Sequence, residues 1–141
     1  MKIYSGLLLG LLAAPGMAQP LADWVAYQDG QALQLAIDAN SLWMEKDGLV
    51  HFVNQERFDK ARYEKAYRLN YNIRRTNGYA DCKQYQYVFV SSEYFDKNNK
   101  HLFSTMFPVP RYAWKWQPVY DGSVAAAMMK VICDAAGAAS K

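Results

Sequence analysis

Basic and aromatic side chains alternate in one short segment near the C-terminal end of the chain, residues 111–116 (RYAWKW). Aromatic rings flanked by cations contact glycans, nucleic acids and proteins, because rings stack and attract cations to their faces. Arg111, Tyr112, Trp114 and Trp116 are therefore candidate binding residues. The same spacing of two also describes a strand whose aromatic side chains face the core, and this alternative stays open.

A second candidate binding surface comes from residues 67–74, in which apolar and polar side chains alternate. This alternation predicts a half-buried strand with one wet face. Arg68 and Arg74 fall on the wet face. They are candidate interface anchors, because arginine often anchors interfaces. A solvated sheet face that binds nothing is the alternative.

Patterns typical of catalysis or metal binding are missing from the sequence. The two histidines, His51 and His101, have no cysteine or acidic residue at metal-ligand spacing. The serines lie in no nucleophile-elbow pattern, and there is no glycine-rich phosphate loop. We expect a protein that is not an enzyme and that holds neither a metal nor a cofactor.

Turn signals divide the rest of the chain into short strands. Asp-Gly pairs at 29–30 and 47–48 each separate two strand-like runs, which predicts two hairpins. The charged residues 55–66 are interpreted as a solvated connection with a helical turn. The later elements that we expect are a tight turn at 76–78, a strand at 79–89, a strand at 102–107 and a short edge segment at 112–117.

One strong helix is predicted, in the apolar stretch that follows residue 123. Val124, Met128 and Val131 fall within a narrow arc at 100° per residue, and Asp121 or Ser123 can cap the first turn. So apolar a helix must lie on a curved sheet or in a groove. The sequence thus predicts an α+β domain, with a curved antiparallel sheet of about six strands and one C-terminal helix packed on a face.

The first residues have the pattern of a secretory signal peptide. Lys2 precedes the apolar run 6–14, and Ala18 ends a small-residue cleavage site. The apolar run is too short for a membrane anchor and is followed by Pro15. We therefore expect residues 1–18 to be removed.

Cleavage would leave residues 19–141 as one domain, with a core at about 24–136. No later apolar stretch is long enough to span a membrane. The formal net charge of only +3 argues against nucleic acid as a partner. We expect an exported protein that is periplasmic, at the cell surface or secreted.

The two cysteines, Cys82 and Cys133, are an even number in a chain with an export signal. Such a count predicts a disulfide, because exported proteins meet an oxidising compartment. The alternative is a pair of free buried thiols. The bridge would tie the C-terminal helix to the sheet.

Several short motifs, in order along the chain, resemble the surface-adhesin protein E family of Gram-negative bacteria. They are WVAY at 24–27, DANSL at 38–42, DGLV at 47–50, YADC at 79–82, YFD at 94–96 with LFS at 102–104, and WQPV at 116–119 followed by DGS at 121–123 and Cys133. The resemblance covers most of the chain that would remain after signal cleavage.

The resemblance implies a curved antiparallel sheet with a helix on its concave face and a disulfide between them. It also implies an exported binding protein that contacts host extracellular-matrix or bacterial envelope proteins through an exposed sheet face. The chain lacks the lipidation cysteine of some relatives, so a periplasmic envelope or stress-related protein without adhesive activity is the alternative. No binding residue can be carried over from the family position by position.

Overall fold

The computed structural model describes residues 21–137, so the expected signal peptide at 1–18 lies outside the described residues. In chain order the elements are β1 (Trp24–Asp29), β2 (Leu33–Asp38), the 3₁₀ turn η1 (Ala39–Ser41), β3 (Trp43–Met44), β4 (Val50–Glu64), β5 (Leu69–Asp81), β6 (Gln86–Phe95), β7 (His101–Ser104), the 3₁₀ turn η2 (Arg111–Ala113), β8 (Gln117–Pro118) and α1 (Val124–Ala135).

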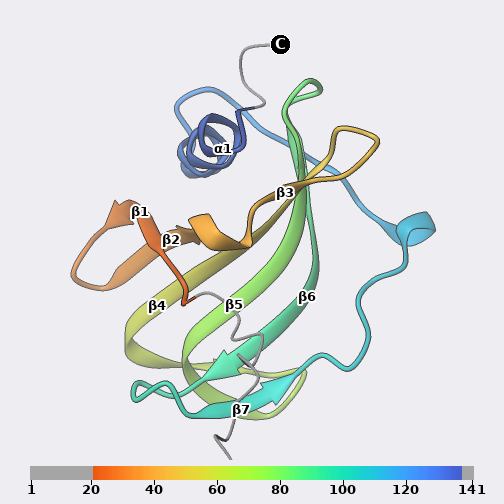
Figure 1. Ribbon diagram of the computed structural model, residues 1–141. Helices are drawn as coiled ribbons and strands as arrows, with labels where there is room; N and C mark the ends of the chain where they lie inside the picture. The colour runs from red at the N-terminus through yellow and green to blue at the C-terminus, as the bar shows by residue number, and fades with distance from the viewer. Residues whose placement is uncertain (1–20, 138–141) are drawn as a thin grey trace, which may run out of the picture.

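The strands form one antiparallel sheet. Its order is β1-β2-β4-β5-β6-β7, with β3 paired to β4 and β8 paired to β6. Figure 1 shows β4, β5 and β6 as long bent strands, with α1 lying across one side of the sheet. The predicted α+β class, with an antiparallel sheet and one C-terminal helix, is confirmed.

The core lies between α1 and the sheet. Ile37, Val50 and Phe52 are fully buried on the sheet side, and Met129 and Ile132 are fully buried on the helix. Burying each such side chain contributes about 1.5–3 kcal/mol, so this contact holds the helix in place. The arc of apolar residues predicted on the helix therefore marks the face that packs.

Ser123 caps α1. Its side-chain oxygen accepts a hydrogen bond of 3.1 Å from the backbone N–H of Ala126 in the first turn. Of the two capping residues that the sequence allows, the structure uses Ser123.

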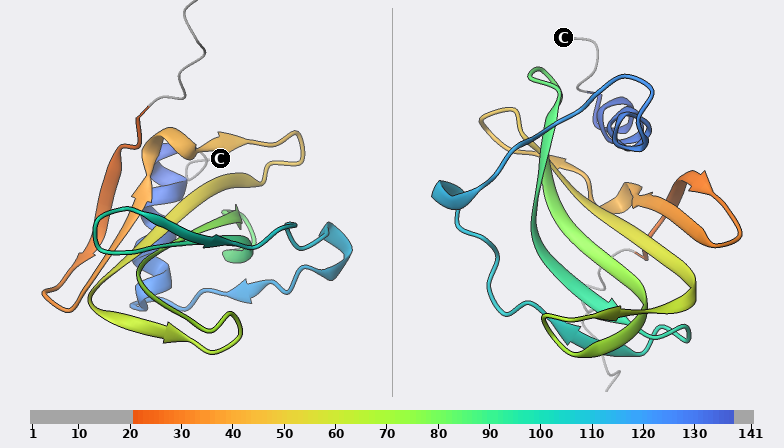
Figure 2. Two further views of the ribbon diagram at one scale, coloured as in Figure 1. Left: turned by 90° about the horizontal axis from the view of Figure 1, so that it is seen from below. Right: turned by 180° about the vertical axis from the view of Figure 1, so that it is seen from behind.

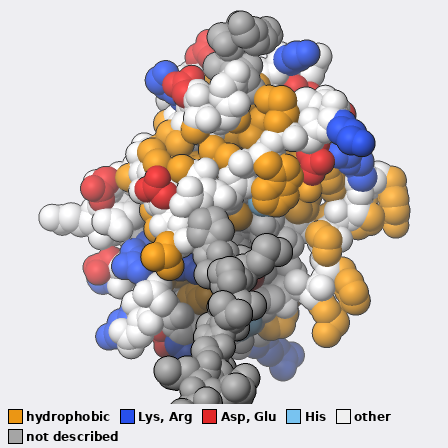
Figure 3. All heavy atoms as spheres, viewed as in Figure 1, with side chains coloured by type: hydrophobic (Ala, Val, Ile, Leu, Met, Phe, Trp, Pro, Cys, Tyr) orange, Lys and Arg blue, Asp and Glu red, His pale blue; other side chains and the backbone are white. Residues whose placement is uncertain are grey.

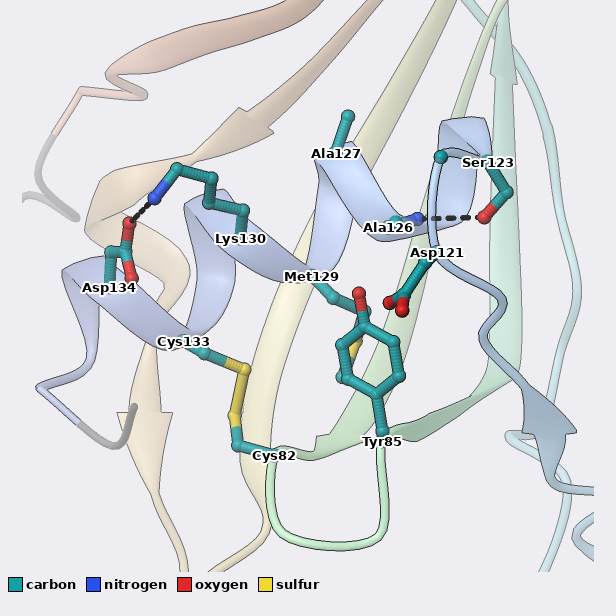
Figure 4. A pocket seen from close by; sticks show the side chains of 11 residues that line it. Cys82, Tyr85, Asp121, Ser123, Ala126, Ala127, Met129, Lys130, Cys133 and Asp134 are labelled. Atoms are coloured by element: carbon teal, nitrogen blue, oxygen red, sulfur yellow. Dashed lines mark hydrogen bonds and ion pairs between the residues drawn. A yellow bond between two sulfur atoms is a disulfide. The ribbon is translucent and has the colours of Figure 1, made fainter. Parts of the chain in front are cut away.

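The predicted disulfide between Cys82 and Cys133 is confirmed, with Cα atoms 6.0 Å apart. Figure 4 shows it joining α1 to the turn between β5 and β6. The sequence reading placed Cys82 inside a long strand at 79–89, which is wrong. The chain reverses directly after Asp81, and Tyr85 completes the reversal with a left-handed backbone, φ 55°.

Residues 55–66 are not the solvated connection expected from their charge. They form the second half of β4 and part of the hairpin that leads to β5. Pairing with both β2 and β5 overrides the local preference of charged side chains, several of which point to solvent at an exposed end of the strand.

The tight turn predicted at residues 76–78 is also wrong, because β5 continues through it. Gly78 serves close packing instead. A Cβ atom at this position would lie 2.6 Å from the Phe52 ring and 2.5 Å from the backbone oxygen of Val88. Glycine is thus required where three strands and the core ring approach one another.

The segment after β7 is more irregular than expected. The strand predicted at 102–107 ends at Ser104, and the predicted edge segment at 112–117 is strand only at its last residue. Pro108 and Pro110 lack backbone donors, which disfavours a regular ladder here. The segment therefore runs over the sheet as a loop with one 3₁₀ turn.

Candidate binding surface

The sheet has one face packed on α1 and a second face that α1 does not cover, which we call the open face. Along β4 and β5, Phe52 and Ala80 point into the helix-covered core. Their neighbours His51 and Tyr79 point the other way, because side chains alternate along a strand. Figures 1 and 2 show the segment between β7 and β8 on the side of the sheet opposite to α1.

Five ring side chains form a continuous stack on the open face. The ring centroids of Trp43 and His51 are 3.6 Å apart and nearly parallel, and those of His51 and Tyr79 are 5.5 Å apart. Tyr79 stacks on Trp114 at 4.8 Å, and Trp114 meets Trp116 edge to face at 5.8 Å. We call these five residues the aromatic ladder. Such contacts each add about 0.5–1.5 kcal/mol beyond simple burial.

His51 anchors the ladder from beneath. It is buried, its Nδ1 donates to the backbone oxygen of Ser41 at 2.8 Å, and its Nε2 lies 3.2 Å from the side-chain oxygen of Asn77. The indole N–H of Trp43 donates to Glu45 at 3.1 Å. Because both rings are held by hydrogen bonds as well as by stacking, the ladder is rigid.

Arg111 joins the ladder to the turn between β3 and β4. Its guanidinium lies over the Trp114 ring, 5.0 Å from the centroid, and forms an ion pair of 2.7 Å with Asp47. The backbone N–H of Leu49 and then Arg111 hold the pKa of Asp47 below its usual value. Both partners of the ion pair are well exposed, so its contribution is positional rather than strongly stabilising.

Much of this surface is accessible to solvent. The side chain of Trp43 is 50% exposed, and Tyr112 beside the ladder is 93% exposed. Met106 and Phe107, in the same loop, are also largely exposed. Figure 3 shows hydrophobic side chains protruding along the right-hand edge of the molecule, where Figure 1 places the segment between β7 and β8. Exposed aromatic groups of this density are typical of contact sites.

The structure brings together four of the six binding residues predicted from sequence. Arg111, Tyr112, Trp114 and Trp116 lie in one loop on the open face. The alternative, in which their aromatic rings face the core, is wrong for Tyr112, which points to solvent. Trp114 packs on Tyr79, outside the core between the helix and the sheet.

Arg68 and Arg74 do not join this surface. Arg68 lies in the turn between β4 and β5 with a positive φ of 50°. Arg74 pairs with Glu56 at 2.6 Å, on the face that carries α1. Burial lowers the pKa of Arg74, but the charge and hydrogen bond of Glu56, with smaller effects of Tyr71 and Tyr94, raise this pKa overall. The two arginines therefore do not share one wet face: Arg68 lies in a turn, and Arg74 forms a partly buried ion pair.

Three ladder residues, Trp43, His51 and Tyr79, were not among the predicted binding residues. The sequence pattern that could have indicated them is strand alternation. Each lies on a predicted strand next to a residue that faces the core, so its own side chain is expected on the opposite face. The contact with Trp114 across 35 residues could not be read from that pattern, because it depends on the path of the irregular loop.

A separate hollow of about 640 Å³ lies beside the disulfide (Figure 4). In Figure 4 the Tyr85 ring and the Asp121 carboxylate lie next to one another, and Lys130 turns to Asp134, 2.7 Å away. These groups contain no nucleophile paired with a base.

Within residues 21–137, no three histidine, cysteine or acidic side chains are placed to hold a metal ion together. The one α-helix in the same range has 12 residues and is too short to cross a membrane.

These features define a class of protein: a small disulfide-linked α+β domain that presents a rigid aromatic surface suited to binding. The comparison with known families agrees. The family model for surface-adhesin protein E matches residues 24–134, and the chain belongs to this family. Membership points to an exported or surface protein and to binding rather than catalysis.

Solved structures show the same fold. Crystal form II of Haemophilus influenzae protein E is 18% identical, with a TM-score of 0.56, over 73% of this chain and 82% of that chain. Protein E from non-typeable Haemophilus influenzae is 16% identical, with a TM-score of 0.55, over 84% of this chain and 82% of that chain. No curated protein sequence matches this chain.

Proposed function

We propose that this protein is an exported adhesin that contacts host extracellular-matrix or bacterial envelope proteins through the open face of its sheet. The contact surface consists of the aromatic ladder together with Arg111 and Tyr112. The observation that carries the proposal is the rigid and partly exposed stack from Trp43 to Trp116.

The composition of this surface favours protein binding. Tryptophan, tyrosine and arginine are the residues that most often dominate the energy of protein interfaces. Stacking fixes the ladder before binding, so little side-chain freedom is lost when a partner docks. The exposed Tyr112 and the Arg111 fork add polar groups at the edge of the apolar patch.

Two substitutions test the proposal, Trp43→Ala and Tyr112→Ala, in binding assays of the purified protein on immobilised matrix and envelope protein preparations. Each is expected to weaken binding by about tenfold or more, the effect of losing a central aromatic contact. Tyr63→Ala is the matched control, because Tyr63 is 62% exposed but lies on the β4–β5 hairpin. If Trp43→Ala and Tyr112→Ala bound as tightly as the wild type and Tyr63→Ala, the ladder would be excluded as the contact surface.

A further inference from the structure

Another cavity, of about 560 Å³, lies on the open face. Two arginines are among the residues that line it. Arg57 comes from β4 and Arg75 from β5, and both alternate with residues that face α1. The remaining walls are the Trp24 ring, the carboxylate of Asp29, two alanines and three side-chain amides. The amides belong to Gln34, Gln55 and Asn99, and the alanines are Ala26 and Ala36.

Arg75 is held in one orientation inside this cavity. Its guanidinium carbon lies 4.4 Å from the Phe95 ring centroid and 5.3 Å from that of Trp24. Its Nε donates a hydrogen bond of 2.8 Å to the side-chain oxygen of Gln55. Two rings and one amide thus fix the plane of the guanidinium, which leaves its two terminal nitrogens as a preoriented pair of donors.

Neither arginine is neutralised by a carboxylate in the described part of the chain. Their guanidinium nitrogens form no ion pair within 4.0 Å among residues 21–137, and the Arg57 guanidinium donates a hydrogen bond of 3.4 Å to the amide oxygen of Asn99. Burial is the main cause that lowers the pKa of Arg75. The nearby Glu93 carboxylate raises this pKa, the charge of Arg57 lowers it again, and Asp38 has the smallest, raising effect. A partly buried cation of this kind favours an anionic ligand.

The lining groups other than the arginines narrow the class of ligand. Side-chain amides and a carboxylate are the partners that sugar hydroxyls use, and the Asp29 carboxylate already accepts a hydrogen bond of 2.9 Å from Gln34. The Trp24 ring adds an apolar surface on which a sugar ring can pack. Asp29 opposes an anion placed beside it, so the anionic group must lie at the arginine end of the cavity.

The geometry points to an acidic saccharide as the ligand of this cavity. The sulfate or carboxylate of one sugar unit accepts hydrogen bonds from Arg57 and Arg75, and its hydroxyls meet Asp29, Gln34 and Asn99. This inference uses other residues than the aromatic ladder, so it stands or falls separately from the proposed protein-binding surface.

The test is a titration of the purified protein with N-acetylglucosamine 6-sulfate, followed by calorimetry and by the NMR signals of the Trp24 indole N–H and the Arg75 Nε–H. N-Acetylglucosamine and inorganic sulfate are the matched probes for the two halves of the ligand. The sulfated sugar is expected to bind at least about tenfold more tightly than either half, with shifts at both signals.

Arg57→Gln and Arg75→Gln are each expected to weaken this binding by about tenfold. Arg57 is exposed, so its variant keeps the test valid even if loss of Arg75 disturbs folding. Arg62→Gln removes an exposed arginine of the same strand outside the cavity and should change nothing. Equal binding of sulfated and neutral sugar, or binding that survives Arg57→Gln, would overturn the inference. Binding of inorganic sulfate as tight as that of the sulfated sugar would overturn the saccharide assignment.

Discussion

At the scale of single residues, the bond between Cys82 and Cys133 combines two roles. It closes a segment across 51 positions of sequence, and it joins the helix that covers the core to the β5–β6 turn. Its presence followed from residue counting and an export signal, without any knowledge of the fold. Its exact attachment to a turn did not, because only the pairing of β5 with β6 shows where the chain reverses.

Removing the bridge should lower the free energy of unfolding by about 4 kcal/mol, the chain-entropy estimate for a loop of this length. The variant is Cys82→Ser with Cys133→Ser, compared with the oxidised wild type by urea unfolding. Wild type kept in reductant serves as a control that changes no side chain. Coincident unfolding curves for the variant and the oxidised protein would show that the bridge contributes no stability.

At the scale of elements, the strands were predicted from sequence more accurately than the turns between them. The two Asp-Gly pairs mark turns in the structure, one after β1 and one between β3 and β4. The Asn-Gly pair at 77–78 has the same local signal but lies mid-strand. There Gly78 is needed for space beneath the Phe52 ring. Local sequence cannot separate these cases, since the difference is a tertiary contact.

Gly78→Ala tests this explanation. The added methyl group would overlap the buried Phe52 ring and the Val88 backbone, so the free energy of unfolding should fall by about 1–3 kcal/mol. Thermal and urea unfolding of the variant measure the change. Ser91→Ala, on the neighbouring strand β6, is the control and should have little effect. If Gly78→Ala were as stable as wild type, the close approach of the three strands would be wrong.

At the scale of the whole molecule, the fold class and the disulfide could be predicted from sequence, and the binding role of the segment at 111–116 stays a prediction. The assembled surface could not be predicted. Trp43, Tyr79 and Trp114 come from two strands and a loop, and only the three-dimensional path of that loop brings them together. Arg68 and Arg74 lie outside this surface. Arg68 is in the turn between β4 and β5, and Arg74 forms an ion pair with Glu56.

The central claim is that this protein acts outside the cell as an adhesin. The most direct measurement is antibody labelling and protease treatment of intact cells that produce it, with a known periplasmic protein as the protected control. The account predicts labelling of intact cells and loss of the protein on protease treatment. Protection equal to that of the periplasmic control would contradict the adhesin proposal and would assign the open face to a partner inside the envelope.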